Sequence, residues 1–375
     1  ATSFSNPILS AHTTQTHSES IACMLEAVTC AVKLLFQKPP QPTPHCSCPL
    51  HAEGTNLLPL SQSSPSTHFP PSVPAMEGIQ IQDIRVVGLT VTSEQSQAVD
   101  WLLQSLREDP TTLSLSVAYM NWETVEWVPT PHRQHVVQLW EMDKALRLQV
   151  WSLVAQHLHQ VETVHLAGTD EYWKEVFCPM DVQDMQALFP KDSLKGVQDL
   201  LLQCFCGISD DAIRHLTEVA GCGGNITSLR LFGLKGDLTD NAFQYFSASG
   251  CGPKLTSLSL RCLFGITDLA LQYLASGGCG PQLTDLVLHA LPELTDEGIH
   301  KLTAAGCGSQ LTSLTLHTLE AGITDKSLER LAAAGCGPDL RSLSLYILKK
   351  GVTDRGLECL CSAGCGPRLQ LLWLG

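Results

Sequence analysis

The chain has few basic residues for its length. Its 375 residues include 23 lysines and arginines against 37 aspartates and glutamates, which gives a formal net charge of −14. Proteins that bind nucleic acids normally carry a basic stripe or patch, so this balance argues against a nucleic-acid partner. An acidic surface also favours solubility and weakens adhesion to anionic membranes.

Long apolar runs are also missing. No stretch reaches the roughly 18 uninterrupted apolar residues that indicate a membrane-spanning helix. The nearest candidate, residues 21–36, contains Glu26 and Lys33 and lacks the basic leader and cleavage site of a signal peptide. We interpret this segment as a short amphipathic helix, and we expect a cytoplasmic protein with no membrane partner.

Motifs of the common enzyme classes are absent as well. The sequence has no phosphate-binding loop, no nucleophile elbow and no zinc-protease motif. Paired carboxylates such as Asp210 and Asp211 stand at an expected helix start, where the helix dipole is sufficient to explain them. We therefore expect a protein that is not an enzyme and that has no cofactor, no catalytic residues and no metal site.

What the chain has instead is an internal repeat of 28 or 29 residues. Each complete unit opens with L-x-x-L-x-L, continues with I-T-D and a helical pattern, and closes with G-C-G-P, or with close variants of these phrases. A fixed period of this length is typical of a solenoid. The units begin at Val197, Ile226, Leu255, Leu283, Leu311, Leu340 and Leu369.

Each unit predicts one strand followed by one helix. The alternation in L-x-x-L-x-L is typical of a strand with one buried face, so pairs such as Leu286/Leu288 should stack on the same pair in the next unit. The threonine of I-T-D should cap the helix, the aspartate should lie in its first turn, and G-C-G-P should end it. Because one unit cannot bury its apolar face alone, the units should stack, with parallel strands on the concave side and helices on the convex side.

These units resemble leucine-rich repeats. The I-T-D-x-x-L-x-x-L-A helix with a cysteine near its end is similar to the cysteine-containing subclass, and the resemblance covers residues 197–375. It implies an α/β fold, a leucine-rich-repeat solenoid. The subclass is familiar from substrate receptors of F-box ubiquitin ligases and from protist repeat families, so the resemblance also implies a protein partner. No F-box-like helical motif is apparent upstream.

One position departs from that family pattern. Leucine-rich repeats usually place Asn or Cys three residues after the second strand leucine, where it satisfies loop amides. Here the position is apolar in every unit, so we expect the loop hydrogen bonds to be arranged differently. The residues are Phe205, Leu234, Leu263, Leu291, Leu319 and Leu348.

Composition divides the chain into three regions. Residues 1–75 are rich in Ser, Thr, Pro and His and should be largely unstructured. Residues 76–196 are interpreted as degenerate repeats with a helical insertion, and a separate helical domain is the alternative. Residues 197–375 are the regular repeats, and because they stop within the strand of a seventh unit we interpret the chain as a truncated part of a longer array.

The degenerate repeats are recognised by their spacing. Ile84/Val86 and Leu113/Leu115 lie 29 residues apart, and residues 93–106 between them have a helical pattern. Val164/Leu166 continue the series at wider spacing, after an insertion rich in Trp and His. We expect these strands to join the same sheet as the regular repeats.

Six of the sixteen cysteines recur once per repeat and predict buried, reduced thiols that fill space at the helix ends. Metal ligation or redox chemistry is the alternative. Residues 45–51 (HCSCPLH) and a C-terminal cysteine cluster have ligand-type side chains, but we assign a metal to neither. The recurring cysteines are Cys222, Cys251, Cys279, Cys307, Cys336 and Cys365, and the C-terminal cluster is Cys359, Cys361 and Cys365.

The expected concave face carries the candidate binding site. The third, fifth and seventh positions of L-x-x-L-x-L-x point away from the core. The third and fifth are mostly small and polar, whereas the seventh is aromatic and cationic, a composition enriched at binding hot spots. An ordinary polar rim is the alternative. The candidate residues are Phe232, Arg261, His289, His317 and Tyr346 from the seventh position, with Arg230 and Trp373 from the fifth.

These features predict a non-enzymatic protein–protein interaction module or scaffold that binds its partner along the concave face. The first alternative is the substrate-recognition subunit of an SCF-type ubiquitin ligase. A secreted or surface receptor is a further alternative, for which Asn225-Ile226-Thr227 would supply a glycosylation sequon. That alternative needs a signal peptide and disulfide caps, and neither is evident.

Overall fold

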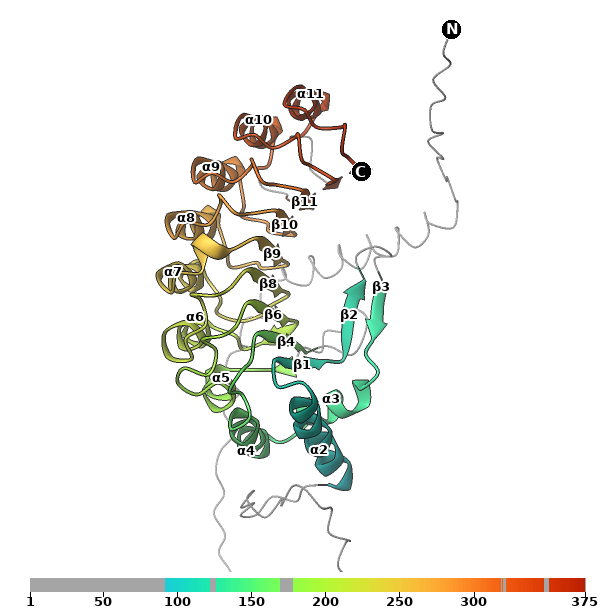
Figure 1. The fold of residues 1–375 in the computed structure, drawn as a ribbon, viewed down its shortest axis with the longest axis vertical. Coiled ribbons are helices and arrows are strands. Elements are labelled where there is room, and N and C mark those ends of the chain that lie inside the picture. The colour runs from blue at the N-terminus through green and yellow to red at the C-terminus, as the bar shows by residue number, and fades with distance from the viewer. Residues whose placement is uncertain are drawn as a thin grey trace, which may run out of the picture. The chain divides into compact units, whose positions relative to one another are not determined.

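The computed structural model describes residues 92–121, 126–168, 178–317, 319, 322–346 and 351–374. Strands and helices alternate through these residues, and neighbouring strands of the main sheet are parallel. The fold is a leucine-rich-repeat solenoid (Figure 1). The expectations for residues 1–75, including the helix at 21–36, and for a strand at Ile84/Val86 concern positions outside the described residues.

Within the described ranges, nine strands form the main sheet, and their spatial order is their order along the chain. Because β1 pairs with β4 and β4 with β6, Leu113 and Val164 lie in the same sheet as the regular repeats, as their spacing predicted. The exact boundaries of the three sequence regions stay a prediction. The strands are β1 (Thr112–Ser116), β4 (Thr163–Ala167), β6 (Asp199–Gln203), β8 (Ser228–Phe232), β9 (Ser257–Arg261), β10 (Asp285–His289), β11 (Ser313–His317), β12 (Ser342–Tyr346) and β13 (Leu371–Leu374).

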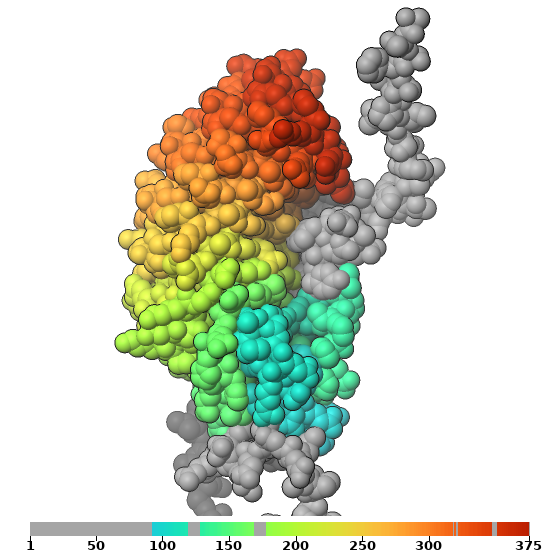
Figure 2. All heavy atoms as spheres, in the orientation of Figure 1, coloured from blue at the N-terminus to red at the C-terminus, as the bar shows by residue number. Residues whose placement is uncertain are grey.

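The helices stack on the other side of the sheet and give the array its convex face (Figure 1), and Figure 2 shows the repeats following one another in chain order. One helix is irregular, because α6 continues into a π-helical turn, η2 (His215–Val219). The convex helices are α4 (Lys144–Ala155), α5 (Val182–Leu188), α6 (Asp210–Arg214), α7 (Asn241–Ala248), α8 (Asp268–Ser276), α9 (Asp296–Ala304), α10 (Asp325–Ala333) and α11 (Asp354–Ser362).

The insertion between β1 and β4 is not wholly helical, which corrects the expectation for that segment. It begins with an antiparallel hairpin of β2 (Ala118–Asn121) and β3 (Glu126–Pro129), which pair with each other and not with the main sheet. Helix α3 (Arg133–Trp140) follows and packs near α2 (Ser93–Glu108). The hairpin extends from the N-terminal end of the array (Figure 1).

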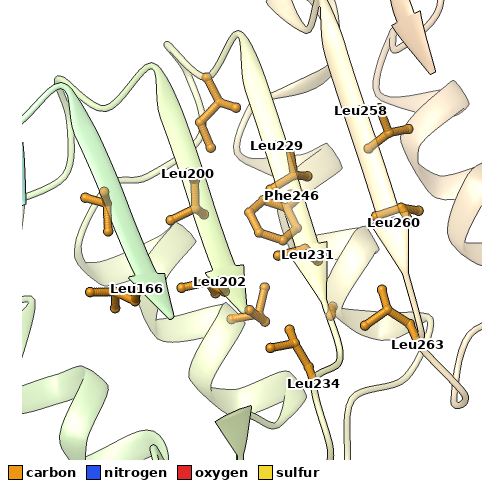
Figure 3. Packing of buried hydrophobic residues seen from close by; sticks show 14 of the residues in the cluster. Leu166, Leu200, Leu202, Leu229, Leu231, Leu234, Phe246, Leu258, Leu260 and Leu263 are labelled. Carbon is orange, nitrogen blue, oxygen red and sulfur yellow. The ribbon is translucent and has the colours of Figure 1, made fainter. Parts of the chain in front are cut away.

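The strand leucines form the core behind the sheet, as the alternation predicted. Leu286 is in register with Leu314 and Leu288 with Leu316, and all four side chains are fully buried. Figure 3 shows the same stacking from Leu166 to Leu260, with Phe246 of α7 filling the space behind the strands. Burying a leucine contributes roughly 1.5–3 kcal/mol, so this ladder supplies a large share of the driving force for stacking.

The apolar loop position is buried as well, and the loop hydrogen bonds come from the backbone. After the strands from β6 to β10, the following residue donates its N–H to the carbonyl that ends the next strand, for example Gly233 to Arg261 at 2.9 Å and Ala290 to His317 at 2.9 Å. This residue has a positive φ, 58° at Gly233 and 51° at Ala290, which turns its N–H toward the neighbouring unit. The buried residues at the apolar position include Phe205, Leu234, Leu263, Leu291 and Leu319.

Aspartate and threonine side chains join the helix starts of successive units. As predicted, Thr324 caps its own helix by accepting from the Lys326 N–H at 3.2 Å. In addition, the Asp296 carboxylate of the preceding unit accepts from the Thr324 N–H at 2.8 Å and from its hydroxyl at 2.6 Å. We call these contacts the Asp–Thr ladder, and its pairs are Asp210–Thr239, Asp240–Thr267, Asp268–Thr295, Asp296–Thr324 and Asp325–Thr353.

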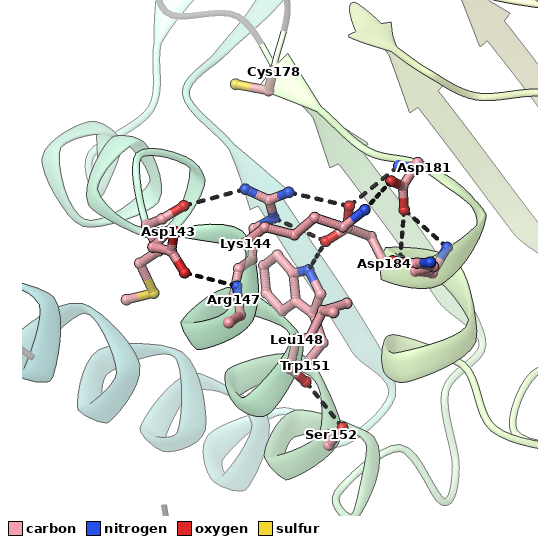
Figure 4. A network of polar contacts seen from close by, with 12 residues as sticks. Asp143, Lys144, Arg147, Leu148, Trp151, Ser152, Cys178, Asp181 and Asp184 are labelled. Atoms are coloured by element: carbon pink, nitrogen blue, oxygen red, sulfur yellow. Dashed lines mark hydrogen bonds and ion pairs between the residues drawn. The ribbon is translucent and has the colours of Figure 1, made fainter. Parts of the chain in front are cut away.

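A buried ion pair joins the helices α4 and α5 of the degenerate repeats (Figure 4). Arg147 donates to Asp184 from Nε at 2.8 Å and from Nη2 at 3.2 Å, and the Trp151 indole N–H donates to the same carboxylate at 3.1 Å. Asp184 is fully buried, and a buried charge is tolerated when it is paired and hydrogen-bonded in this way. The network therefore connects the helices of two successive degenerate repeats.

Candidate partner-binding surface

The predicted binding residues meet on the concave face. Phe232, Arg261, His289, His317 and Tyr346 end five consecutive strands, and each is the register partner of the next. Trp373 and Arg230 lie two residues earlier on their strands, at the fifth position. We call these seven residues the concave stripe. Strand alternation places all of them on the side of the sheet opposite the leucine core.

The C-terminal half of the concave stripe is a continuous series of rings. His289 and His317 meet edge to face with ring centroids 4.3 Å apart, and His317 stacks on Tyr346 at 4.6 Å. Tyr346 meets Trp373 edge-on at 6.4 Å. Trp373 lies on β13 and its residue surface is 43% exposed, so the series ends in a ring with much of its surface open. Aromatic pairs of this kind contribute beyond the area they bury.

The two histidines of the concave stripe, His289 and His317, are each half-buried. Burial, followed by the charge of Arg261, lowers the pKa of His317 to about 4. Burial also lowers the pKa of His289 well below its ordinary value, with smaller effects from His317 and Arg261. Both rings are therefore neutral near pH 7.

Arg261 lies on β9, between the ring series that begins at His289 and the charged residues on the strands before it. Its Nε donates to the Ser259 hydroxyl at 2.8 Å, so the guanidinium bends back along β9. Burial, together with the charge of Arg230, lowers the pKa of Arg261 to about 10, which leaves it a cation near neutral pH.

A charged cluster continues the concave stripe toward the N-terminal strands. Arg230 donates from Nη2 to both oxygens of Asp199, at 3.0 and 2.7 Å, and the same carboxylate lies 2.8 Å from His165 Nε2. Burial raises the pKa of Asp199, but the His165 hydrogen bond and the Arg230 charge outweigh it and lower the pKa to about 2. The three residues come from β4, β6 and β8, so the polar cluster spans three neighbouring strands.

Sequence reasoning missed His165 as a member of this surface. It stands between Val164 and Leu166, two core residues of β4, and therefore occupies the same fifth position as Arg230 and Trp373. Extending the columns into the degenerate repeats would have found it. Its contact with Arg230, two strands away, depends on side-chain length and direction, which the column pattern does not contain.

The recurring cysteines lie in the core at the helix ends. Cys251, Cys279 and Cys307 are fully buried, and burial raises the pKa of Cys251 and Cys307 to about 12 and that of Cys279 further. All six are free thiols. No group of three or more His, Cys, Asp or Glu side chains in the described part of the chain could hold a metal ion. Residues 45–51 lie outside that part, and Cys361 of the C-terminal cluster is exposed.

The asparagine of the sequon is occupied by protein contacts. Asn225 Nδ2 donates to the Lys195 carbonyl at 2.8 Å, and its Oδ1 accepts from Lys254 Nζ at 2.7 Å. These contacts join three successive units, so the side chain has a structural role. Within the described ranges, no helix has the length and apolar character needed to cross a membrane.

Comparison with known proteins adds little to this surface. No protein-family model matches the chain, and no curated protein matches it. Among solved structures, the yeast complex of Rad7 and Elc1 contains a similar chain, with 18% identity and a TM-score of 0.32. The match covers 60% of this chain and 65% of that chain, so just under two thirds of the solved chain is spanned. A similarity this low supports no argument about binding.

Proposed function

We propose that this chain is a non-enzymatic protein-interaction module whose partner lies along the concave stripe. The observation that carries the proposal is the series of ring contacts from His289 on β10 to Trp373 on β13, in register with Arg261 and Phe232 on the two strands before it. Aromatic and arginine side chains are the types that dominate binding energy at protein interfaces. They are held here by a rigid sheet, so little conformational freedom is lost on binding.

The composition of the face supports a protein partner over other classes. The chain is acidic overall, at −14, which disfavours a nucleic acid. The third positions are small and polar in most strands, as at Ser228, Ser257 and Ser313, so a partner backbone can approach closely and find hydroxyl groups. The proposal places the protein in the cytoplasm, where the six buried thiols would remain reduced.

The test is capture of a partner by the full chain and by single variants. We expect Phe232→Ala and Tyr346→Ala to weaken capture of the same identified protein by at least about tenfold, which corresponds to 1.4 kcal/mol. Phe264→Ala is the matched control, because Phe264 is 39% exposed and lies outside the concave stripe. Equal capture by all three variants, with unchanged melting, would remove the concave stripe from the binding site.

A substrate-recognition subunit of a ubiquitin ligase is the second candidate. The observation that favours it is the I-T-D helix with a buried cysteine near its end, as in α8 and α10, the pattern that resembles the cysteine-containing subclass. Such a subunit must bind a ligase adaptor as well as a substrate. Copurification of the full chain with an adaptor and cullin would support this function, and its absence would leave a simple scaffold.

A further inference from the structure

The two arginines of the concave stripe already have partners. Arg230 donates from Nη2 to both oxygens of Asp199, at 3.0 and 2.7 Å. Arg261 Nε donates to the Ser259 hydroxyl at 2.8 Å. A charged residue of a partner would have to displace these contacts. The part of the concave stripe that remains open to a ligand is therefore the ring series on the C-terminal strands.

The ring series carries no charge near neutral pH. Burial lowers the pKa of both His289 and His317, so these rings are neutral, and Tyr346 and Trp373 add two uncharged rings. The Asp285 carboxylate belongs to the opposite end of β10 from His289, roughly 13 Å away along the strand. A charged side chain placed on the rings would lose hydration without gaining an opposite charge. Charge complementarity therefore requires an uncharged segment here.

The spacing of the rings follows the strands and selects the conformation of that segment. Neighbouring strands are about 4.8 Å apart, so rings two strands apart are separated by about 9.6 Å. In a polyproline II helix, side chains on one face recur every three residues, or about every 9.3 Å. In a β-strand they recur about every 6.7 Å, and an α-helical turn advances about 5.4 Å. Of the three conformations, polyproline II stays closest in register with the rings over several strands.

The hydrogen-bonding groups of the rings also suit this conformation. A polyproline II segment has no internal hydrogen bonds, so its carbonyl groups are free to accept. The Tyr346 hydroxyl and the Trp373 indole N–H are donors, and Trp373 is 43% exposed. Proline rings pack on aromatic side chains, and their preformed conformation loses little entropy on binding.

We propose that the ring series from His289 to Trp373 binds an uncharged, proline-rich segment of a partner protein in the polyproline II conformation. The segment runs across the strands, and prolines three residues apart pack against rings two strands apart, such as His289 and Tyr346. Seven residues of this kind span roughly 19 Å, which is close to the four strand spacings from β9 to β13. This inference rests on the proposed function and adds the chemistry and conformation of the bound segment.

The test measures binding of fluorescein-labelled heptapeptides to the full chain by fluorescence anisotropy. The first peptide, Pro-Ser-Leu-Pro-Ser-Leu-Pro, has prolines three residues apart. The second, Pro-Ser-Pro-Leu-Pro-Ser-Leu, has the same composition with prolines two residues apart, and the third has alanine in place of each proline of the first. We expect the first to bind at least about tenfold more tightly than the third and about threefold more tightly than the second.

Charged analogues of the first peptide test the requirement for an uncharged segment. Replacing both serines by glutamates, or both by lysines, should weaken binding. Raising the salt concentration from about 0.05 to 0.5 M should change the affinity of the first peptide by less than about twofold, because no ion pair contributes.

Variants of the chain then locate the site. Tyr346→Ala and Trp373→Ala should each weaken binding of the first peptide at least about fivefold, whereas Tyr346→Phe should retain most of the affinity because the ring remains. Phe264→Ala is the control, since Phe264 is 39% exposed and lies outside the concave stripe. Thermal melting of each variant checks that folding is intact.

Four results would overturn the inference and leave the proposed function standing. The first peptide binds no more tightly than the second or the third, or it fails to bind at roughly millimolar concentration. A charged analogue binds more tightly than the first peptide, or Tyr346→Ala and Trp373→Ala both bind it unchanged. The proposed function fails separately if Phe232→Ala and Tyr346→Ala leave capture of the natural partner unchanged.

Discussion

His317, a residue of the concave stripe, shows how burial of a titratable ring can have a stability cost. Its ring stacks on Tyr346 at 4.6 Å, and burial with the nearby Arg261 lowers its pKa from 6.5 to about 4. In the unfolded chain the same ring takes up a proton near pH 6.5. Protons therefore bind preferentially to the unfolded state between these two values.

The free energy of unfolding should accordingly fall as the pH decreases from 6.5 to 4, and His317 should account for part of that fall. In His317→Phe the loss over this window should be smaller by up to roughly 2–3 kcal/mol, an upper value since the side chain is partly open to solvent. Urea unfolding at pH 7, 5.5 and 4 measures this. Identical pH profiles for both proteins would contradict the assignment of a neutral, desolvated ring.

Adjacent residues of one strand should differ sharply in their effect on folding. Leu314 is fully buried and in register with leucines of both neighbouring strands, whereas Thr315 is half-buried on the concave face. Leu314→Ala should lower the free energy of unfolding by roughly 2–5 kcal/mol, and Thr315→Ala by less than about 1 kcal/mol. Denaturant unfolding of the two variants is the measurement, and equal losses would contradict the assigned face of β11.

For single residues, the sequence predicted which face of a strand a side chain occupies better than it predicted the hydrogen-bond and ion-pair partners of that side chain. The seventh-position residues were predicted because strand alternation depends only on local geometry. The ion pair of Arg230 with Asp199 was not predicted, because it depends on which way a long side chain turns across the sheet. The bent conformation of Arg261 toward Ser259 has the same explanation.

Each regular helix begins at a threonine that makes two kinds of contact: it caps its own helix, and it bonds to an aspartate of the preceding repeat. Thr324 caps α10 through its own side chain, but it is also held by Asp296 of the preceding unit. Asp296→Ala removes the side-chain acceptor of the part-buried Thr324 N–H and hydroxyl. It should lower the free energy of unfolding by roughly 2–3 kcal/mol.

Asp339→Ala is the matched control for that substitution. Asp339 pairs with Arg368, and both side chains are about half exposed or more, at 49% and 63%. Exposed pairs contribute little, so this variant should lose less than about 1 kcal/mol. Thermal and urea unfolding should separate the two variants, and an equal small loss in both would show that the Asp–Thr ladder contributes nothing to stability.

Among the elements, the regular strands and helices were predictable and the irregular ones were not. Capping threonines and terminal glycines are local signals, and they placed α8 to α11 correctly. The hairpin of β2 and β3 has no Asn-Gly or Asp-Gly turn, so no turn signal in the local sequence predicted it. The π-helical turn at His215–Val219 likewise depends on packing, where His215 Nε2 lies 2.8 Å from the Phe189 carbonyl.

Over the whole molecule, the reactivity of the six recurring thiols indicates whether the repeats are packed in their native arrangement. They are buried, and burial raises the pKa of Cys251, Cys307 and Cys336 to about 12, so the reactive thiolate is scarce. In the native protein, alkylation should modify Cys361 quickly and the six recurring thiols slowly. Denaturant without reductant should make all six reactive.

Peptide mapping by mass spectrometry resolves the individual cysteines, and Cys361→Ser provides the control for the fast site. Rapid native labelling of Cys279 or Cys307 would contradict the packed helix ends. A requirement for reductant before labelling in denaturant would show that these thiols are oxidised in the protein tested.

The Asp–Thr ladder gives folding a direction. In each pair the acceptor belongs to the earlier unit and the donors belong to the later one, so the amide of a new helix start is satisfied only when its predecessor is already in place. A ribosome delivers units in that same order, earlier before later. The helix start of each emerging repeat therefore meets a finished acceptor, whereas the loop N–H after its strand, as at Gly233, gains its acceptor only when the next strand has been made.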